Sequence, residues 1–276
     1  MPESINDLAK LCVHTQTNRP WNLEQCIRNY SGAGIHAISI WRHLLDETSP
    51  SDVKSLLVEH EMDVVSLVRG GFFASSEKPA REAVIEDNLK AIDQAAAIGA
   101  PLLVLVCGSD PGQSLEKSRE QIQEGILKII PYSKDAGIRL AIEPLHPMYA
   151  ADRSAITSMA QANEMVEQIG DYSLGVAVDL FHLWWDPDLE KEIKRCGREG
   201  NLFAFHVCDW NVPLKDMLND RGLMGDGCIN VKQIRGWIEE AGFKGYSEVE
   251  VFSDKYWAMN QLDYLERIKY AYLNHT

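Results

Sequence analysis

Four acidic or imidazole side chains lie at or near the ends of short apolar runs in the second half of the chain. Glu143 ends IRLAIE, Asp179 ends LGVAVD, His206 lies in LFAFHV and Glu250 lies in YSEVEV. A carboxylate inside such a run is unfavourable to bury unless it is paired or binds a metal. If the runs are parallel strands, their carboxyl ends converge, and three carboxylates with one imidazole predict a site for one divalent metal ion. The predicted ligands are Glu143, Asp179, His206 and Glu250, with Mn²⁺ favoured and Mg²⁺, Co²⁺ or Zn²⁺ compatible.

The last of these runs contains two glutamates. Side chains alternate along a strand, so Glu248 and Glu250 lie on the same face and periodicity does not choose between them. Glu250 lies nearer the carboxyl end, level with the other ligands, and is therefore assigned to the metal. We expect Glu248 one layer deeper, paired inside the protein or with a group behind the ligands.

Eight short apolar runs recur along the whole chain, and longer segments with helical periodicity separate them. Near-continuous apolar strands that alternate with amphipathic helices predict a parallel sheet covered by helices. No glycine-rich phosphate loop follows the first run, and no linker divides the chain, so we predict an α/β fold with a single (β/α)8 TIM barrel over residues 1–276. The expected strands are 10–15, 35–40, 63–68, 101–106, 138–143, 174–179, 202–207 and 246–251.

Two of the connecting segments have well-marked helix signals. Residues 80–98 place apolar side chains on one face and end at Gly99, which is a helix-stop signal. Residues 114–136 begin at Ser114 and end before Gly137, with Pro131 as an expected kink.

Composition narrows the classes of function. The chain has 27 Lys and Arg against 41 Asp and Glu, a formal net charge of −14, which argues against binding to nucleic acid. No apolar stretch approaches the ~20 residues that span a bilayer, and MPESINDLAK lacks the pattern of a secretory leader. The six cysteines form no C-x-x-C pair, which is typical of reduced thiols in the cytoplasm. We therefore expect a cytoplasmic protein with a small-molecule substrate and no membrane or nucleic-acid partner.

With its metal ligands in this order, the chain resembles the xylose-isomerase-like TIM-barrel superfamily. The resemblance runs from VHTQT through EPLHP, VDLFHLWW and FHVCDW to GYSEVEVFS. That superfamily contains sugar and sugar-phosphate isomerases and epimerases, inosose dehydratase and the endonuclease IV group. The resemblance implies that Glu143 and Glu250 serve both as ligands and as an acid/base pair. It also implies that His182 and Arg221 contact substrate oxygens.

Further residues near the strand ends are candidates for the site. His146, in EPLHP, departs from the epimerase pattern and matches a histidine that acts as a base in barrel lyases on 3-keto-glycosides. Substrate contacts are also predicted for three residues near strand ends, namely Asp209, His14 and Arg42. Arg69 and Arg153 could line the same mouth, and Arg153 is a candidate for binding an anion.

Two reaction classes are consistent with these residues. The favoured one is a metal-dependent isomerase or epimerase of a sugar or keto-sugar, which removes a proton next to a metal-bound carbonyl. The alternative is a lyase, dehydratase or decarboxylase that forms the same enolate and then expels a group. The presence of His146 favours this alternative. An endonuclease is disfavoured, because the segment after the seventh run, GDGCI, lacks additional histidine ligands. A barrel that binds a sugar without catalysis is a further alternative. A homo-oligomer is also compatible with the sequence.

Overall fold

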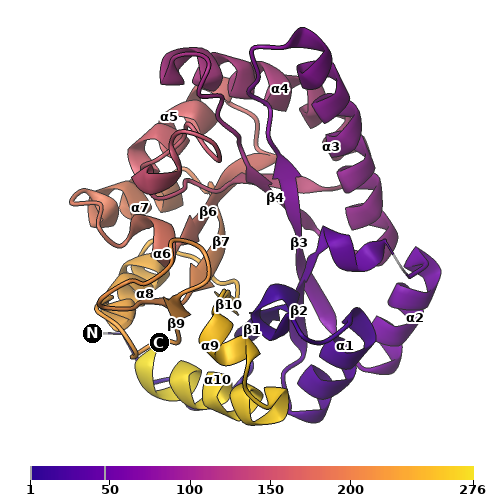
Figure 1. The fold of residues 1–276 in the computed structure, drawn as a ribbon, viewed down its shortest axis with the longest axis vertical. Helices are drawn as coiled ribbons and strands as arrows, with labels where there is room; N and C mark the ends of the chain where they lie inside the picture. Colours follow the sequence, from indigo (N-terminus) through magenta and orange to yellow (C-terminus); the bar gives the residue numbers. More distant parts are fainter. Residues whose placement is uncertain (1, 47) are drawn as a thin grey trace.

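The computed structural model, which describes residues 2–46 and 48–276, contains a closed barrel of eight parallel strands surrounded by helices (Figure 1). Around the barrel the strands follow the order β1-β10-β7-β6-β5-β4-β3-β2. Each predicted run overlaps one of them, although β2 and β3 extend one and three residues beyond their runs, so the predicted (β/α)8 barrel is confirmed. Their bounds are Leu11–His14 (β1), Ala37–Trp41 (β2), Asp63–Gly71 (β3), Leu102–Val106 (β4), Arg139–Ile142 (β5), Leu174–Asp179 (β6), Leu202–Val207 (β7) and Ser247–Val249 (β10).

Local sequence signals explain where the two predicted helices begin and end. The segment predicted at 80–98 starts two residues earlier, because Pro79 fits the first turn of a helix, and it ends at Gly99 in the left-handed conformation. Ser114 caps the next helix by accepting a hydrogen bond from the Lys117 amide, and that helix continues through Pro131. The longer helices are Leu23–Gly32 (α1), Pro50–Glu59 (α2), Lys78–Ile98 (α3), Leu115–Asp135 (α4), Met159–Ile169 (α5), Leu189–Arg198 (α7), Val231–Glu240 (α8) and Gln261–His275 (α10).

Short elements occupy the carboxyl ends of the strands, where the predicted site lies. They include Leu180–Leu183 (α6), Asp254–Trp257 (α9) and three 3-10 turns at Thr15–Asn18, Arg42–Leu45 and Pro147–Tyr149. Asp209–Trp210 (β8) and Arg221–Gly222 (β9) pair as a small antiparallel ribbon that the sequence did not predict. This ribbon brings Arg221 back over the barrel. Within the described part of the chain, no helix is both long and apolar enough to cross a membrane.

Side chains alternate between the outside and the inside of the barrel. On β4, Leu103 and Leu105 belong to the main core that packs with the helices, whereas Leu102 and Val104 belong to a second cluster. We assign this second cluster to the barrel interior from the alternation. Its members are Val68, Leu102, Val104, Ala141, Ala177 and Ala204. The alanines are small, which leaves room in the interior for polar side chains.

Candidate metal centre and active site

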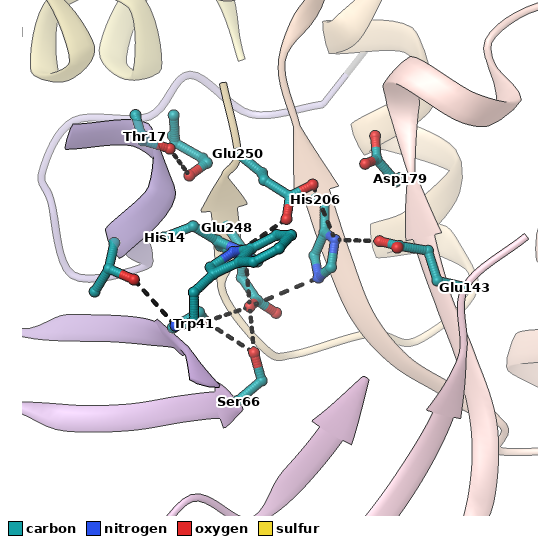
Figure 2. A network of polar contacts seen from close by, with 12 residues as sticks. His14, Thr17, Trp41, Ser66, Glu143, Asp179, His206, Glu248 and Glu250 are labelled. Carbon is teal, nitrogen blue, oxygen red and sulfur yellow. Dashed lines mark hydrogen bonds and ion pairs between the residues drawn. The ribbon is translucent and has the colours of Figure 1, made fainter. Parts of the chain in front are cut away.

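The four predicted metal ligands meet at the carboxyl ends of four neighbouring strands. One ligand atom from each of them lies within 4.8 Å of the others, and all four residues are buried. His206 Nδ1 lies 2.9 Å from Glu143 Oε1 and 4.0 Å from Glu250 Oε2 (Figure 2). Asp179 ends β6 and lies opposite His206 in the register of β6 and β7. Three carboxylates and one imidazole that converge in this way fit a divalent cation with room for substrate oxygens.

Arg221, from the ribbon strand β9, contacts two of these ligands. Its Nη1 donates to Asp179 Oδ2 at 3.0 Å and to Glu250 Oε2 at 2.9 Å. The guanidinium lies between the rings of Phe181 and Phe252, with its central carbon 4.5 and 4.6 Å from the ring centres. These rings hold Arg221 beside the cluster, where its charge offsets part of the carboxylate repulsion.

The two carboxylates that contact Arg221 differ in their surroundings. Burial raises the pKa of Asp179 to about 7, although the Arg221 charge opposes the shift. Burial would also raise the pKa of Glu250, but His14 and Arg221 hold it well below its usual range. Glu250 is therefore a carboxylate at neutral pH, whereas Asp179 is partly protonated until a cation or another charge replaces its proton.

A second layer of polar side chains lies behind the ligands. Glu248 Oε2 accepts a hydrogen bond from the Ser39 hydroxyl at 2.6 Å and lies 3.2 Å from His14 Nε2. The other nitrogen of His14, Nδ1, lies 3.0 Å from Glu250 Oε1. Glu248 thus occupies the deeper position predicted for it. The prediction that His14 contacts substrate differs from the structure, because His14 is fully buried and both of its ring nitrogens face glutamates.

The imidazole of His206 lies between these two layers. Its Nε2 lies 3.8 Å from Glu248 Oε2 and has no hydrogen-bond partner among the described residues. Burial opposes protonation, yet the hydrogen bond to Glu143 and the charge of Glu248 raise the pKa of His206 to about 10. A metal ion at Nδ1 must therefore displace a proton. It would leave Nε2–H facing Glu248, an arrangement that orients metal-bound histidines.

A cavity opens above the cluster and contains about 400 Å³ of empty space, including open solvent at its mouth. Glu143 and Glu250 line it, whereas Asp179 and His206 are not among the described residues of its wall. The wall consists of Trp41, Arg69, Val106, Glu143, Leu145, Tyr149, Arg153, His182, Leu218, Arg221, Glu250 and Phe252.

His182, which is predicted to contact substrate, lines the cavity. Its Nδ1 accepts a hydrogen bond from the His146 amide at 3.2 Å, and its Nε2 lies 3.3 Å from Arg221 Nη2. Burial and the Arg221 charge hold the pKa of His182 well below its usual value. The imidazole is therefore neutral and fixed in orientation at the cavity wall.

The structure does not bring His146 into this cavity, contrary to the expectation of a base beside the metal. Its Nδ1 accepts a hydrogen bond from the Met148 amide at 3.2 Å and caps the turn Pro147–Tyr149. Its ring packs 5.1 Å from the ring of Trp210 and 5.7 Å from that of Trp185, measured between centres. The rigid EPLHP segment turns this side chain toward the tryptophans rather than toward Glu143.

Two other residues that were predicted to contact substrate, Asp209 and Arg42, bind groups of the protein instead. Asp209 is fully buried, and its oxygens accept hydrogen bonds from four backbone amides within its own loop. Arg42 makes two hydrogen bonds to Asp87, at 2.9 and 3.0 Å, and one to Gln94. Asp209 therefore shapes a loop, and Arg42 braces a 3-10 turn against α3.

Sequence reasoning missed several wall residues. Tyr149 follows the EPLHP segment, and Phe252 lies two residues beyond Glu250, so proximity to the ligands was their only sequence signal. Leu218 belongs to the loop between the two ribbon strands, and no sequence pattern pointed to it.

A closed barrel of parallel strands with a carboxylate and histidine cluster at their carboxyl ends defines a TIM barrel with a site suited to a divalent metal. The chain belongs to the xylose isomerase-like TIM barrel family, whose model matches residues 27–270.

Known proteins of similar sequence or structure cover nearly the whole chain. An inosose isomerase of Halalkalibacterium halodurans is 25% identical over 281 residues, which covers 95% of this chain and 93% of that protein. A solved protein from Sinorhizobium meliloti 1021 is 40% identical, with a TM-score of 0.94 and coverage of 98% and 99% of the two chains. The IOLI protein, solved with a bound zinc atom, has a TM-score of 0.85 at 19% identity and covers 96% of this chain and 97% of its own.

Proposed function

We propose that the chain is a divalent-metal-dependent isomerase or epimerase of a sugar or keto-sugar. In this proposal Glu143, Asp179, His206 and Glu250 hold the metal, and Glu143 and Glu250 also exchange a proton with the carbon next to a carbonyl. One observation carries it: of the four ligands, only Glu143 and Glu250 are among the described residues that line the cavity. Asp179 and His206 then serve as anchors. The names of the inosose isomerase relatives support the same reaction class.

The barrel separates the two glutamates in a way that suits proton transfer. They follow β5 and β10, which are three positions apart in a ring of eight strands, so they approach the cavity from nearly opposite sides. One carboxylate could remove a proton from one face of a carbon while the other returns it to the opposite face. A bound divalent ion would act as a Lewis acid on the carbonyl oxygen. His182 and Arg221 would orient the neighbouring hydroxyl groups of the sugar.

The lyase alternative receives less support. It depended on His146 as a base beside the metal, and the His146 ring instead packs against Trp185 and Trp210 outside the cavity wall. Elimination by Glu143 or Glu250 would still begin with the same proton transfer. The products therefore have to distinguish the two reactions.

The remaining predictions stand as part of this proposal. Mn²⁺ is the favoured metal, and Zn²⁺ is the ion bound by the structurally similar IOLI protein. A reducing cytoplasm is the proposed location, which agrees with six unpaired cysteines of which five are buried. A single domain over residues 1–276, a homo-oligomer and the absence of a nucleic-acid partner stay predictions.

Solvent deuterium tests the proposed reaction. Metal-loaded protein is incubated in D₂O with a panel of ketoses and inososes. We expect a product that carries deuterium on the carbon next to the carbonyl and that has lost neither water nor a fragment. A product that has lost water or carbon would refute the isomerase. Turnover without deuterium would refute proton exchange by carboxylates.

Two variants test the separate roles of the glutamates. Glu143→Gln and Glu250→Gln should each lower turnover by about 10²- to 10⁴-fold. Each should still exchange deuterium into the one isomer whose proton faces the remaining carboxylate, whereas simple metal loss would stop exchange in both isomers. Metal content is measured alongside, and the exposed Glu120→Gln serves as the matched control. If either variant keeps full turnover, Glu143 and Glu250 are not the acid/base pair.

A further inference from the structure

Two arginines in the cavity wall have no acidic partner among the described residues. Arg69 lies in β3, and Arg153 lies in the loop after the turn Pro147–Tyr149. Both line the cavity that Glu143 and Glu250 enter, and both are half-buried. In the part of the chain that the structure describes, neither guanidinium has an ion pair within 4.0 Å or a side-chain hydrogen bond.

Each guanidinium lies over an aromatic ring. The central carbon of Arg69 lies 4.3 Å from the ring centre of Phe72, and that of Arg153 lies 5.4 Å from the ring centre of Tyr149. A cation–π contact does not neutralise the charge of a guanidinium, whose N–H groups can still donate hydrogen bonds to oxygens. Among the described residues, the donors of both guanidiniums are therefore available to a ligand.

The charges in the cavity show why these donors matter. Glu143, Asp179 and Glu250 together carry three negative charges, which a divalent ion and the Arg221 guanidinium would balance. Arg69 and Arg153 then remain as two positive charges that form no ion pair with a described residue, in a chain whose formal net charge is −14. Burial lowers the pKa of Arg69, and the nearby Arg153 charge lowers it further, whereas the Glu143 carboxylate opposes the shift. An anion between the two arginines would relieve the repulsion between their charges.

We propose that the substrate of this site carries an acidic group, a phosphate ester or a carboxylate, which Arg69 and Arg153 bind together while the rest of the sugar faces Glu143 and Glu250. This inference rests on the proposed function, because it assigns the substrate class of the same cavity. Fork-shaped guanidiniums match the paired oxygens of both anions. The proposal thus points to a sugar phosphate or a sugar acid rather than to an uncharged polyol.

Anion binding to metal-free protein tests the inference without depending on turnover. Isothermal titration calorimetry at constant ionic strength uses inorganic phosphate, D-gluconate and, as the uncharged reference, D-glucose. The titrations are repeated on the Mn²⁺-loaded protein, in which the ion balances the carboxylates, and the difference between the variants there separates binding to the arginines from binding to the ion. We compare the unmodified protein with Arg69→Gln, Arg153→Gln and the exposed control Arg198→Gln.

Loss of one charge-assisted contact corresponds to about a 10- to 100-fold loss of affinity. We expect a loss of this size for phosphate or for gluconate in both cavity variants and unchanged affinity in Arg198→Gln. Loss confined to phosphate assigns a phosphate ester, and loss confined to gluconate assigns a carboxylate. Equal affinity in all four proteins, or no binding of either anion, overturns the inference. Thermal melts check that the variants fold, and Arg69→Lys and Arg153→Lys should fall between glutamine and arginine.

The result of the anion-binding test is independent of the result of the deuterium-exchange test. If no ketose exchanges deuterium but the anion binding depends on Arg69 and Arg153, the reaction is wrong and the acidic ligand stands. If uncharged ketoses are turned over and neither anion binds, the reaction stands and the acidic substrate is wrong.

Discussion

Replacement of Asp209 separates a structural role from a substrate contact more cleanly than any other change near the site. Oδ1 accepts hydrogen bonds from the amides of Trp210 and Ile229, at 2.8 and 2.9 Å. Oδ2 accepts from those of Gly225 and Gly227, at 3.0 and 2.9 Å. The carboxylate thus ties the residues after Arg221–Gly222 to the end of β7. Asn cannot replace it, because its amide nitrogen would face two N–H donors whichever way the group is turned.

The magnitude follows from these four contacts. Each hydrogen bond to a charged acceptor contributes about 1.5–3 kcal/mol, but contacts that share one carboxylate are not additive. Single substitutions rarely exceed about 5 kcal/mol, so we expect Asp209→Asn to lower the free energy of unfolding by roughly 3–5 kcal/mol. With an unfolding entropy of about 2.1 cal/mol/K per residue, a chain of 276 residues should lose roughly 5–9 °C in melting temperature.

Thermal melts and steady-state kinetics provide the assay. The control is Asp216→Asn, since Asp216 also accepts hydrogen bonds from two backbone amides but is exposed in the same loop, and we expect its melting temperature to change by about 1 °C or less. If Asp209→Asn kept its melting temperature and raised only the KM, the carboxylate would contact substrate after all. The loop-shaping role would then be wrong.

Three further predictions concern the layers around the metal ligands. Glu248→Gln should weaken metal affinity about 10- to 100-fold, because His206 loses the carboxylate behind it; unchanged affinity in a metal titration would contradict this role. Metal affinity should rise about tenfold per pH unit between pH 7 and 8.5, since the metal displaces one proton from His206, whose pKa is raised to about 10. Below pH 7 the rise should be steeper, because Asp179 also binds a proton there. A flat pH profile by competition with a metal indicator would show that His206 is already neutral. His146→Ala should retain deuterium exchange within about threefold, because the ring lies outside the cavity wall, and loss of exchange would restore its role as a base.

The barrel and the cluster of proposed metal ligands were predictable for the same reason. In a parallel barrel every strand presents its carboxyl end to one face, so residues at equivalent ends of successive strands converge even when they are far apart in sequence. Glu143, Asp179, His206 and Glu250 therefore came together as expected. The period of two along a strand also placed Glu248 on the face of Glu250 and one layer below it.

The contacts of side chains in loops and just beyond the strand ends could not be predicted from strand periodicity. Which direction a side chain takes there depends on the path of a distant segment, as when the β8–β9 ribbon returns Arg221 to the cluster and turns Asp209 toward its own loop. His146 follows the same rule, because its ring direction is set by contacts with Trp185 and Trp210.

The sequence by itself thus determined the fold and the convergence of the four proposed ligands, because both follow from regular strand periodicity. Only the tertiary structure decided which polar groups remain free to act. Arg42 and Arg69 look equivalent at the ends of neighbouring strands, yet Arg42 pairs with Asp87 whereas Arg69 has no acidic partner among the described residues. Whether a charge is neutralised depends on contacts between elements remote in the chain, and local pattern does not specify them.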